Sequence, residues 1–194
     1  MSTAATDYTL AELCIVAAAE AFRHDGEVLA TGIGVVPRLA ASLAMKTFNP
    51  DLMMTDSEAF MLSEPNPLGK RPADFQQANE SWMGFSRIFD NVWSGKRHAM
   101  LGPTQIDDVD IRRVVTNLCV MDFGGPEHQI RLLSLHPGVT LEEVQENTGY
   151  PIAVPADVPT TPAPTAEQLA IIAGLDPHNQ RAAQIADNPP GIRA

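Results

Sequence analysis

RVVTNLCVMDFGGPEHQIRLLSLHPGVTLEEVQENTGYPI, residues 113–152, is the part of the chain from which the rest of the fold can be argued. Its first residues, 113–120, are mostly β-branched or apolar, and a second apolar run spans 130–135. Gly124-Gly125-Pro126 lies between the two runs at hairpin distance. The pattern therefore predicts two adjacent antiparallel strands joined by a turn.

The same stretch ends in a short predicted helix. Thr140 and Glu143 have the spacing of a capping box, in which each side chain accepts a hydrogen bond from the other residue's backbone amide. The helix should run over 141–148 and stop at Gly149, a residue that suits a left-handed position, with Pro151 just beyond.

This order of elements resembles the carboxy-terminal part of the β subunits of the class I coenzyme A transferase family. There a strand ending in T-[DN]-L-x-V-x-D-F precedes a hairpin, a P-G-V-T turn and a short helix that closes at T-G. The variant DFGGPEH, residues 122–128, is most similar to one branch of the family. That branch holds the β subunits of the hydrolases that open a ring of a cholesterol-derived CoA thioester in steroid-degrading bacteria.

The amino-terminal half has the alternation of an α/β protein. A capping box at residues 9–12 opens an alanine-rich helix to about Arg23, and 27–31 is a plausible strand. A helix with Pro37 in its first turn and a buried strand at 52–55 follow. Strand, helix and strand in succession indicate a parallel sheet. With the resemblance, we expect an α/β fold with an open, mainly parallel sheet and flanking helices, CoA-transferase-like, plus the carboxy-terminal hairpin and short capped helix.

Two glycines, Gly32 and Gly34, stand between the predicted strand and helix. A dinucleotide-binding fingerprint is excluded, because Pro37 and Arg38 occupy the place of its third glycine. Two readings stay open. In one, the glycines serve only a tight turn; in the other, which a similar family turn implies, they bind the substrate or CoA at the amino terminus of the helix.

Ser57 and Glu58 follow a predicted parallel strand, which is where open α/β sheets place their active sites. In the transferases a glutamate in an S-E-N-G context attacks the acyl-CoA thioester to give a glutamyl-CoA thioester. Ser57-Glu58 matches that context, whereas Ala59-Phe60 departs from it. The resemblance implies that Glu58 is catalytic and that Ser57 lines the site. From the sequence alone, a glutamate at the end of a strand is more often solvated or capping.

Gln105 and Asp107 match a further family segment, and the resemblance places them at the border of the substrate site. The alternative is that this segment is a strand and a turn with a structural role only. Between Asp107 and Arg113 the family has several dozen residues that this chain lacks, including a glycine loop thought to contact the thioester oxygen. Apolar side chains over 82–93 have helix-like spacing and suit a core or a subunit interface.

We expect a CoA-transferase-like domain over 9–152, with the family insert absent between 107 and 113, and a proline-rich tail over 153–194. In the tail, 155–164 should form an extended linker on the surface. A capping box of Thr165 and Gln168 should open one short helix, with partial disorder beyond His178.

Composition limits the partners. The net charge of −11 argues against nucleic acid and anionic membranes, which need a basic face. No apolar run is long enough to span a membrane, and the amino terminus has no basic residues of a secretory signal. Cys14 and Cys119 suit small buried side chains in a reducing compartment, so the expected location is the cytoplasm. No metal site and no cofactor are predicted, apart from coenzyme A as part of the substrate.

Together, the resemblance implies the β subunit of a two-subunit CoA-thioester enzyme, active with an α subunit as a heterodimer or heterotetramer. The expected reaction is hydrolytic ring opening of a steroid-derived cyclic keto-acyl-CoA. Two alternatives stay open: a CoA transferase with Glu58 as covalent nucleophile, and a non-catalytic assembly subunit.

Overall fold

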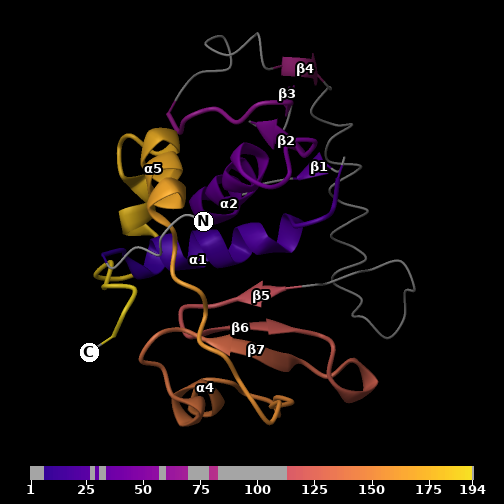
Figure 1. Cartoon of the computed structure of the whole chain (residues 1–194), viewed down its shortest axis with the longest axis vertical. Coiled ribbons are helices and arrows are strands. Elements are labelled where there is room, and N and C mark those ends of the chain that lie inside the picture. The colour runs from indigo at the N-terminus through magenta and orange to yellow at the C-terminus, as the bar shows by residue number, and fades with distance from the viewer. Residues whose placement is uncertain are drawn as a thin grey trace.

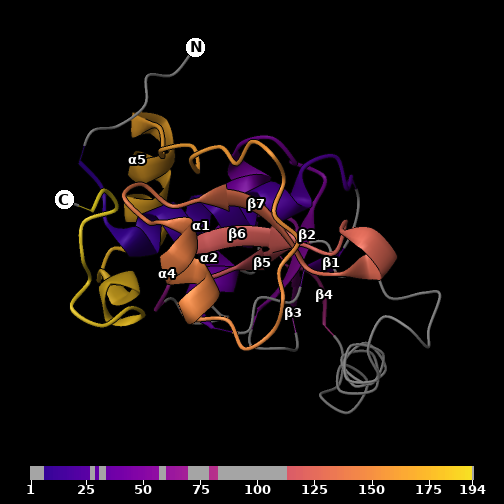
Figure 2. The same ribbon diagram turned by 90° about the horizontal axis from the view of Figure 1, so that it is seen from below.

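A computed structural model of the chain describes residues 7–26, 29–30, 34–56, 60–69, 79–82 and 113–193. Within these residues, two helices, α1 (Leu10–Ala19) and α2 (Val35–Lys46), lie between two small sheets. One sheet, β1 to β4, lies beyond α2, and the other, β5 to β7, covers the opposite side of α1 (Figures 1 and 2). A helix from the tail, α5 (Ala166–Leu175), packs beside both helices.

The first sheet has the order β1-β2-β3-β4, and its only parallel pair is β1 with β2 in the part of the chain that is described. The expected strands at 27–31 and 52–55 are confirmed over their described residues. A mainly parallel sheet is not confirmed, because the other pairings here are antiparallel. The reason is the connection: only residues 57–59 separate β2 from β3, and a parallel crossover needs about a dozen residues or more. The strands of this sheet are β1 (Leu29–Ala30), β2 (Met53–Asp56), β3 (Phe60–Leu62) and β4 (Asn79–Trp82).

Strand β4 was not predicted. Asn79 falls in the stretch expected to be a loop, and Trp82 in the stretch with helix-like spacing. The remainder of that apolar stretch, 83–93, lies outside the described residues. Antiparallel pairing with β3 determines the conformation of 79–82, and such a partner cannot be seen in a local pattern.

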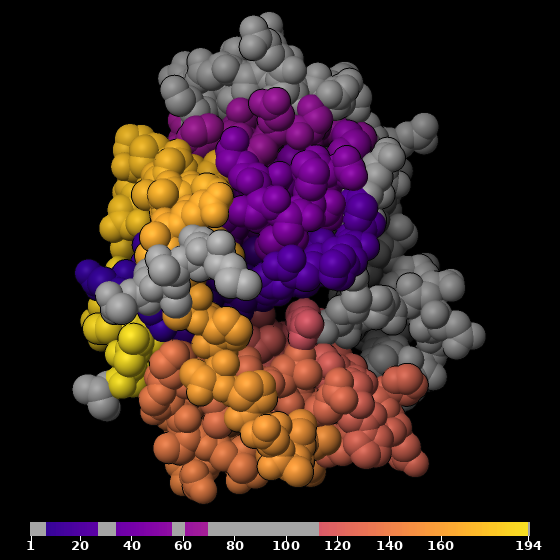
Figure 3. Space-filling view, in the orientation of Figure 1, coloured from indigo at the N-terminus to yellow at the C-terminus, as the bar shows by residue number. Residues whose placement is uncertain are grey.

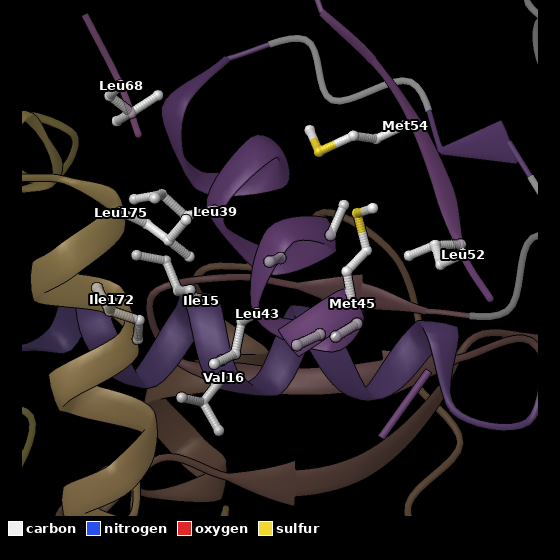
Figure 4. Packing of buried hydrophobic residues seen from close by; sticks show 14 of the residues in the cluster. Ile15, Val16, Leu39, Leu43, Met45, Leu52, Met54, Leu68, Ile172 and Leu175 are labelled. Carbon is white, nitrogen blue, oxygen red and sulfur yellow. The ribbon is translucent and has the colours of Figure 1, made fainter. Parts of the chain in front are cut away.

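The two central helices begin where the sequence places them. At α1 the capping box is complete: the Glu12 amide donates to Thr9 Oγ1 (3.4 Å) and the Thr9 amide to Glu12 Oε2 (2.9 Å). A 3₁₀ turn, Glu20–Phe22, extends the helix almost to Arg23, as expected. The helices, β2 and α5 share one buried cluster (Figure 4). Its largest fully buried members are Ile15, Leu39, Leu43, Leu52, Met54, Leu62 and Ile172.

The second sheet is antiparallel, with β5 (Val114–Val115), β6 (Cys119–Asp122) and β7 (Arg131–Leu135). The predicted hairpin between β6 and β7 is confirmed. The single strand predicted over 113–120 is wrong, because a turn at Thr116 divides it into β5 and β6. The Thr116 hydroxyl accepts from the amides of Leu118 and Cys119, both at 3.1 Å, and this local bonding replaces strand pairing.

The predicted short helix is α4 (Leu141–Glu146), and half of its capping box forms. The Glu143 amide donates to Thr140 Oγ1 at 3.2 Å, but the Glu143 carboxylate accepts from Arg193 instead of the cap amide. The left-handed glycine of this region is Gly138 (φ 78°), in the turn before α4. Gly149 does not have a positive φ, so the predicted left-handed conformation at Gly149 is wrong.

The tail is part of the packed structure. The capping box of Thr165 and Gln168 is confirmed, and α5 buries Ile172 and Leu175 against α1 and α2. Disorder beyond His178 is wrong: Arg181 pairs with Glu12 (3.0 Å) and Asp176 (3.1 Å), and the chain then returns to the start of α1. Buried ion pairs and backbone hydrogen bonds fix these residues in place, and they come from distant parts of the sequence.

Candidate active site

Two of the predicted site segments, the turn with Gly32 and Gly34 and the pair Ser57-Glu58, follow β1 and β2 in the sequence. Strands β1 and β2 are parallel, with Leu29 opposite Met53, so their carboxyl ends lie side by side. Helix α2 begins at Val35, with Gly34 as its N-cap, shortly after β1. Strand β2 ends at Asp56, two residues before Glu58. The described framework thus has the arrangement that the predicted site requires.

Most of the predicted site residues themselves lie outside the described residues. This holds for Gly32, Ser57, Glu58, Gln105 and Asp107. Gly34 is described, and its geometry can be compared with the prediction.

Gly34 is the N-cap of α2, with φ 101° and ψ 163°. An added Cβ would meet only Pro37 Cδ, at 3.7 Å, so space does not require glycine at this position. The backbone conformation does, because side-chain-bearing residues rarely adopt such a positive φ. The first turn of α2 has no side-chain cap and no acidic residue. Its amides and the helix dipole therefore favour an anionic group, although the tight turn alone also explains the glycine.

The end of β2 is fixed by the same core as α2. Leu52 and Met54 are buried in the cluster of Figure 4, and Ser42 of α2 donates a hydrogen bond to Met54 Sδ (3.4 Å). Thr55 is also buried. A site built on these two elements would have rigid support.

The DFGG sequence that carries the family resemblance has a structural role in the β6–β7 hairpin. Arg131 donates to both carboxylate oxygens of Asp122, at 3.0 and 2.6 Å, and the Gly124 amide donates to the same carboxylate (3.0 Å). The hydrogen bonds from Arg131 hold the pKa of Asp122 below its usual value. A Cβ on Gly124 would overlap the Arg131 guanidinium, and one on Gly125 would overlap the Gln129 carbonyl. These glycines close the hairpin, and no catalytic role is assigned to them.

His136 forms a buried network that the sequence analysis did not anticipate. Its Nε2 lies 2.9 Å from the Thr116 carbonyl oxygen, and its Nδ1 lies 3.0 Å from Thr161 Oγ1. A carbonyl can only accept, so Nε2 carries the proton, Nδ1 accepts from Thr161, and Thr161 accepts from Ser134 at 2.7 Å. Burial lowers the pKa of His136, so the ring is neutral and joins β5, β7 and the tail. Nothing in its spacing along the sequence marks it, because its partners are distant residues.

The two cysteines are buried, as predicted. Burial raises the pKa of the Cys14 thiol to about 11 and also raises that of Cys119. Both are therefore poor nucleophiles. Within the described residues, no group of histidine, cysteine and carboxylate side chains could hold a metal ion, and no helix is long and apolar enough to cross a membrane.

Comparison with known proteins establishes the family. The chain is 32% identical to the cholesterol ring-cleaving hydrolase IpdB subunit of Rhodococcus jostii (strain RHA1), over 258 residues that cover 96% of this chain and 100% of the relative. The chain belongs to the IpdB family. The crystal structure of Rhodococcus jostii RHA1 IpdAB matches with a TM-score of 0.78 at 30% identity, covering 93% of this chain and 100% of that one. No family model matches the sequence.

A more distant match supports the fold alone. Glutaconate coenzyme A-transferase from Acidaminococcus fermentans has a TM-score of 0.68 at 16% identity, covering 89% of this chain and 96% of that one. The CoA-transferase-like fold expected from residues 113–152 is therefore confirmed.

The IpdB alignment also measures what the chain lacks. It spans 258 positions, whereas the chain has 194 residues, so more than sixty positions of the relative have no counterpart here. This shortfall agrees in size with the several dozen family residues missing from the sequence. Their location between Asp107 and Arg113 stays a prediction.

Proposed function

We propose that this chain is the β subunit of a two-subunit hydrolase that opens a ring of a steroid-derived cyclic keto-acyl-CoA. The observation that carries the proposal is the relation to the cholesterol ring-cleaving hydrolase IpdB subunit along 96% of this chain, together with the IpdAB fold. The enzyme works with an α subunit and, in keeping with the sequence, in the cytoplasm. Coenzyme A takes part as a component of the substrate, and no other cofactor is required.

The proposed reaction is hydrolysis of a carbon–carbon bond in a β-keto thioester. A carboxylate deprotonates water, whose oxygen adds to the ring ketone carbon. The bond between that carbon and the carbon next to the thioester then breaks. The thioester carbonyl takes up the electron pair as an enolate, and the protonated carboxylate returns its proton to the enolate carbon. The former ketone carbon becomes a carboxylic acid group in the same, now open-chain, molecule.

Within this chain we assign the site to the edge where β1 and β2 end. Glu58 is the candidate carboxylate, and it becomes a wall of the pocket or a secondary base if the α subunit supplies the main one. The amides at the start of α2, with Gly32 and Gly34, are suited to an anionic part of the substrate, which the uncapped first turn supports. Ser57, Gln105 and Asp107 complete the proposed substrate site.

The first test is isothermal titration of acetyl-CoA into the chain alone and with a candidate α subunit. Binding only to the complex, weakened by Glu58→Gln or Gln105→Ala, is expected. Glu64→Gln is the matched control, because Glu64 is an exposed glutamate that follows β3 and is not assigned to the site. A stable complex that binds no acyl-CoA would contradict the enzyme assignment. The alternative of a non-catalytic assembly subunit would then hold, and the absence of more than sixty family positions favours that alternative.

A CoA transferase remains the second candidate, favoured by Glu58 in its Ser57-Glu58 context. A transferase forms a glutamyl-CoA thioester, which hydroxylamine or borohydride traps on Glu58. The hydrolase should give no such adduct with its acyl-CoA substrate, so mass spectrometry of the trapped chain separates the two.

A further inference from the structure

A cavity of about 490 Å³ lies between α1 and the β5–β7 sheet. Figure 3 shows the hollow between the atoms of α1 and those of the second sheet. Val16 and Ala17 form its α1 side, and Val120 and Leu133 form its sheet side. Its size falls in the range of small-molecule pockets, about 300–1,000 Å³.

The tail forms another wall, over Pro159 to Ala163. Backbone hydrogen bonds fix this segment to β7, from the Thr161 amide to the Leu135 carbonyl (2.7 Å) and from the Leu135 amide to the Pro159 carbonyl (3.0 Å). The buried Thr161 hydroxyl adds its contacts with Ser134 and His136. The segment lies largely at the surface, as predicted, but these hydrogen bonds fix it as a wall of a preformed cavity, which lowers the ordering cost of binding.

The charge at the cavity is uneven. Glu20 lies at it, but Arg23 already pairs with both oxygens of this carboxylate, at 2.6 and 2.7 Å. Arg113 also lies at the cavity, is exposed, and makes no ion pair among the described residues. Its charge also acts on Asp122, but that carboxylate accepts its hydrogen bonds from Arg131. Arg113 thus places a guanidinium at the rim of a mostly apolar space. A carboxylate fits this guanidinium.

We propose that this cavity binds a carboxylate with an apolar, ring-sized body, which packs between α1 and β7 while its carboxylate pairs with Arg113. The apolar body contacts Val16, Val120 and Leu133. This binding proposal is independent of the proposed hydrolase activity.

The test compares two aromatic probes of similar shape, 2-naphthoate and its neutral analogue 2-naphthalenemethanol, by titration calorimetry on the full chain. Naphthoate should bind about fivefold more tightly, as expected for an ion pair at a partly exposed cation. Arg113→Met should remove this difference and leave the binding of the alcohol unchanged. Lys46→Met is the matched control, since Lys46 is exposed at the end of α2 and does not line the cavity.

A second variant tests the location. Leu133→Trp should fill the cavity and weaken both probes at least tenfold. Because this change could impair folding, Thr160→Trp, at an exposed position of the tail wall, provides the same test. Equal affinity of the two probes for the unmodified chain would overturn the proposal, as would unchanged binding in Arg113→Met or in a folded tryptophan variant.

Discussion

Arg181 is expected to hold the carboxy-terminal segment on α1, and its removal should destabilise the chain strongly. Its guanidinium lies between two carboxylates, Glu12 of α1 (3.0 Å) and Asp176 (3.1 Å). The Asp176 side chain is 0% exposed, and those of Arg181 and Glu12 are 13% and 12% exposed. Arg181→Met would leave two nearly buried carboxylates without their cation.

Removing one partner of a buried pair costs about 3–5 kcal/mol. Asp176 keeps hydrogen bonds from the Gln180 and Arg181 amides, at 2.8 and 2.9 Å, so we expect the lower end, about 3 kcal/mol. For a chain of this length that corresponds to a fall in Tm of roughly 6–12 °C. Urea unfolding followed by circular dichroism measures the free energy directly.

Arg23→Met is the control for this prediction. Arg23 also pairs with a glutamate, Glu20, but the two side chains are 41% and 38% exposed. Its stacking on Phe48 adds a small contribution, so the total loss should be about 1 kcal/mol. If Arg181→Met costs no more than Arg23→Met, the buried ion pairs do not hold the segment and the reasoning is refuted.

Three further predictions concern Gly34, His136 and the two cysteines. Gly34→Ala should lower stability by at least about 1 kcal/mol in urea unfolding, because alanine resists a φ of 101°; an unchanged midpoint would show that α2 can start differently. Burial lowers the pKa of His136, so below about pH 6.5 the unfolded chain takes up a proton that the native chain does not, and stability should fall. Unfolding of His136→Gln at several pH values should lack that part of the slope. Cys14 and Cys119 should react slowly with a thiol reagent in the folded chain and rapidly in urea, because burial raises both thiol pKa values; fast reaction of the native chain would contradict their burial.

Local patterns predicted the parts of the fold that depend on neighbouring residues. The capping boxes at Thr9 and Thr165 appear where the spacing places them, since both partners lie within one helical turn. The division of β5 from β6 was missed, because the Thr116 hydroxyl competes with strand pairing inside an apolar run. Strand β4 and the return of the tail to α1 depend on distant partners, which no local pattern contains.

For the candidate site, too, the sequence predicted the parts that depend on the order of elements but not those that depend on distant contacts. The turn at Gly34 and the strand that leads to Glu58 could be placed from strand–helix–strand order, and the parallel β1–β2 pair confirms that arrangement. The role of Asp122 in the hairpin depends on Arg131 across the sheet, and that of His136 depends on Thr161 in the tail. Such contacts between separate elements are set by tertiary packing, so residue type and spacing did not reveal them.

The missing family segment bears on whether the proposed edge can still work. The edge rests on β2 and the start of α2, and their support comes from the cluster that includes Leu52, Met54 and Leu43. The tail contributes Ile172 and Leu175 to this cluster through α5. These residues lie before and after the place predicted for the missing segment, between Asp107 and Arg113. The edge therefore keeps its packing although more than sixty positions are absent. The framework that a catalytic edge requires is therefore retained, and acyl-CoA binding by the complex with an α subunit distinguishes a catalytic role from an assembly role.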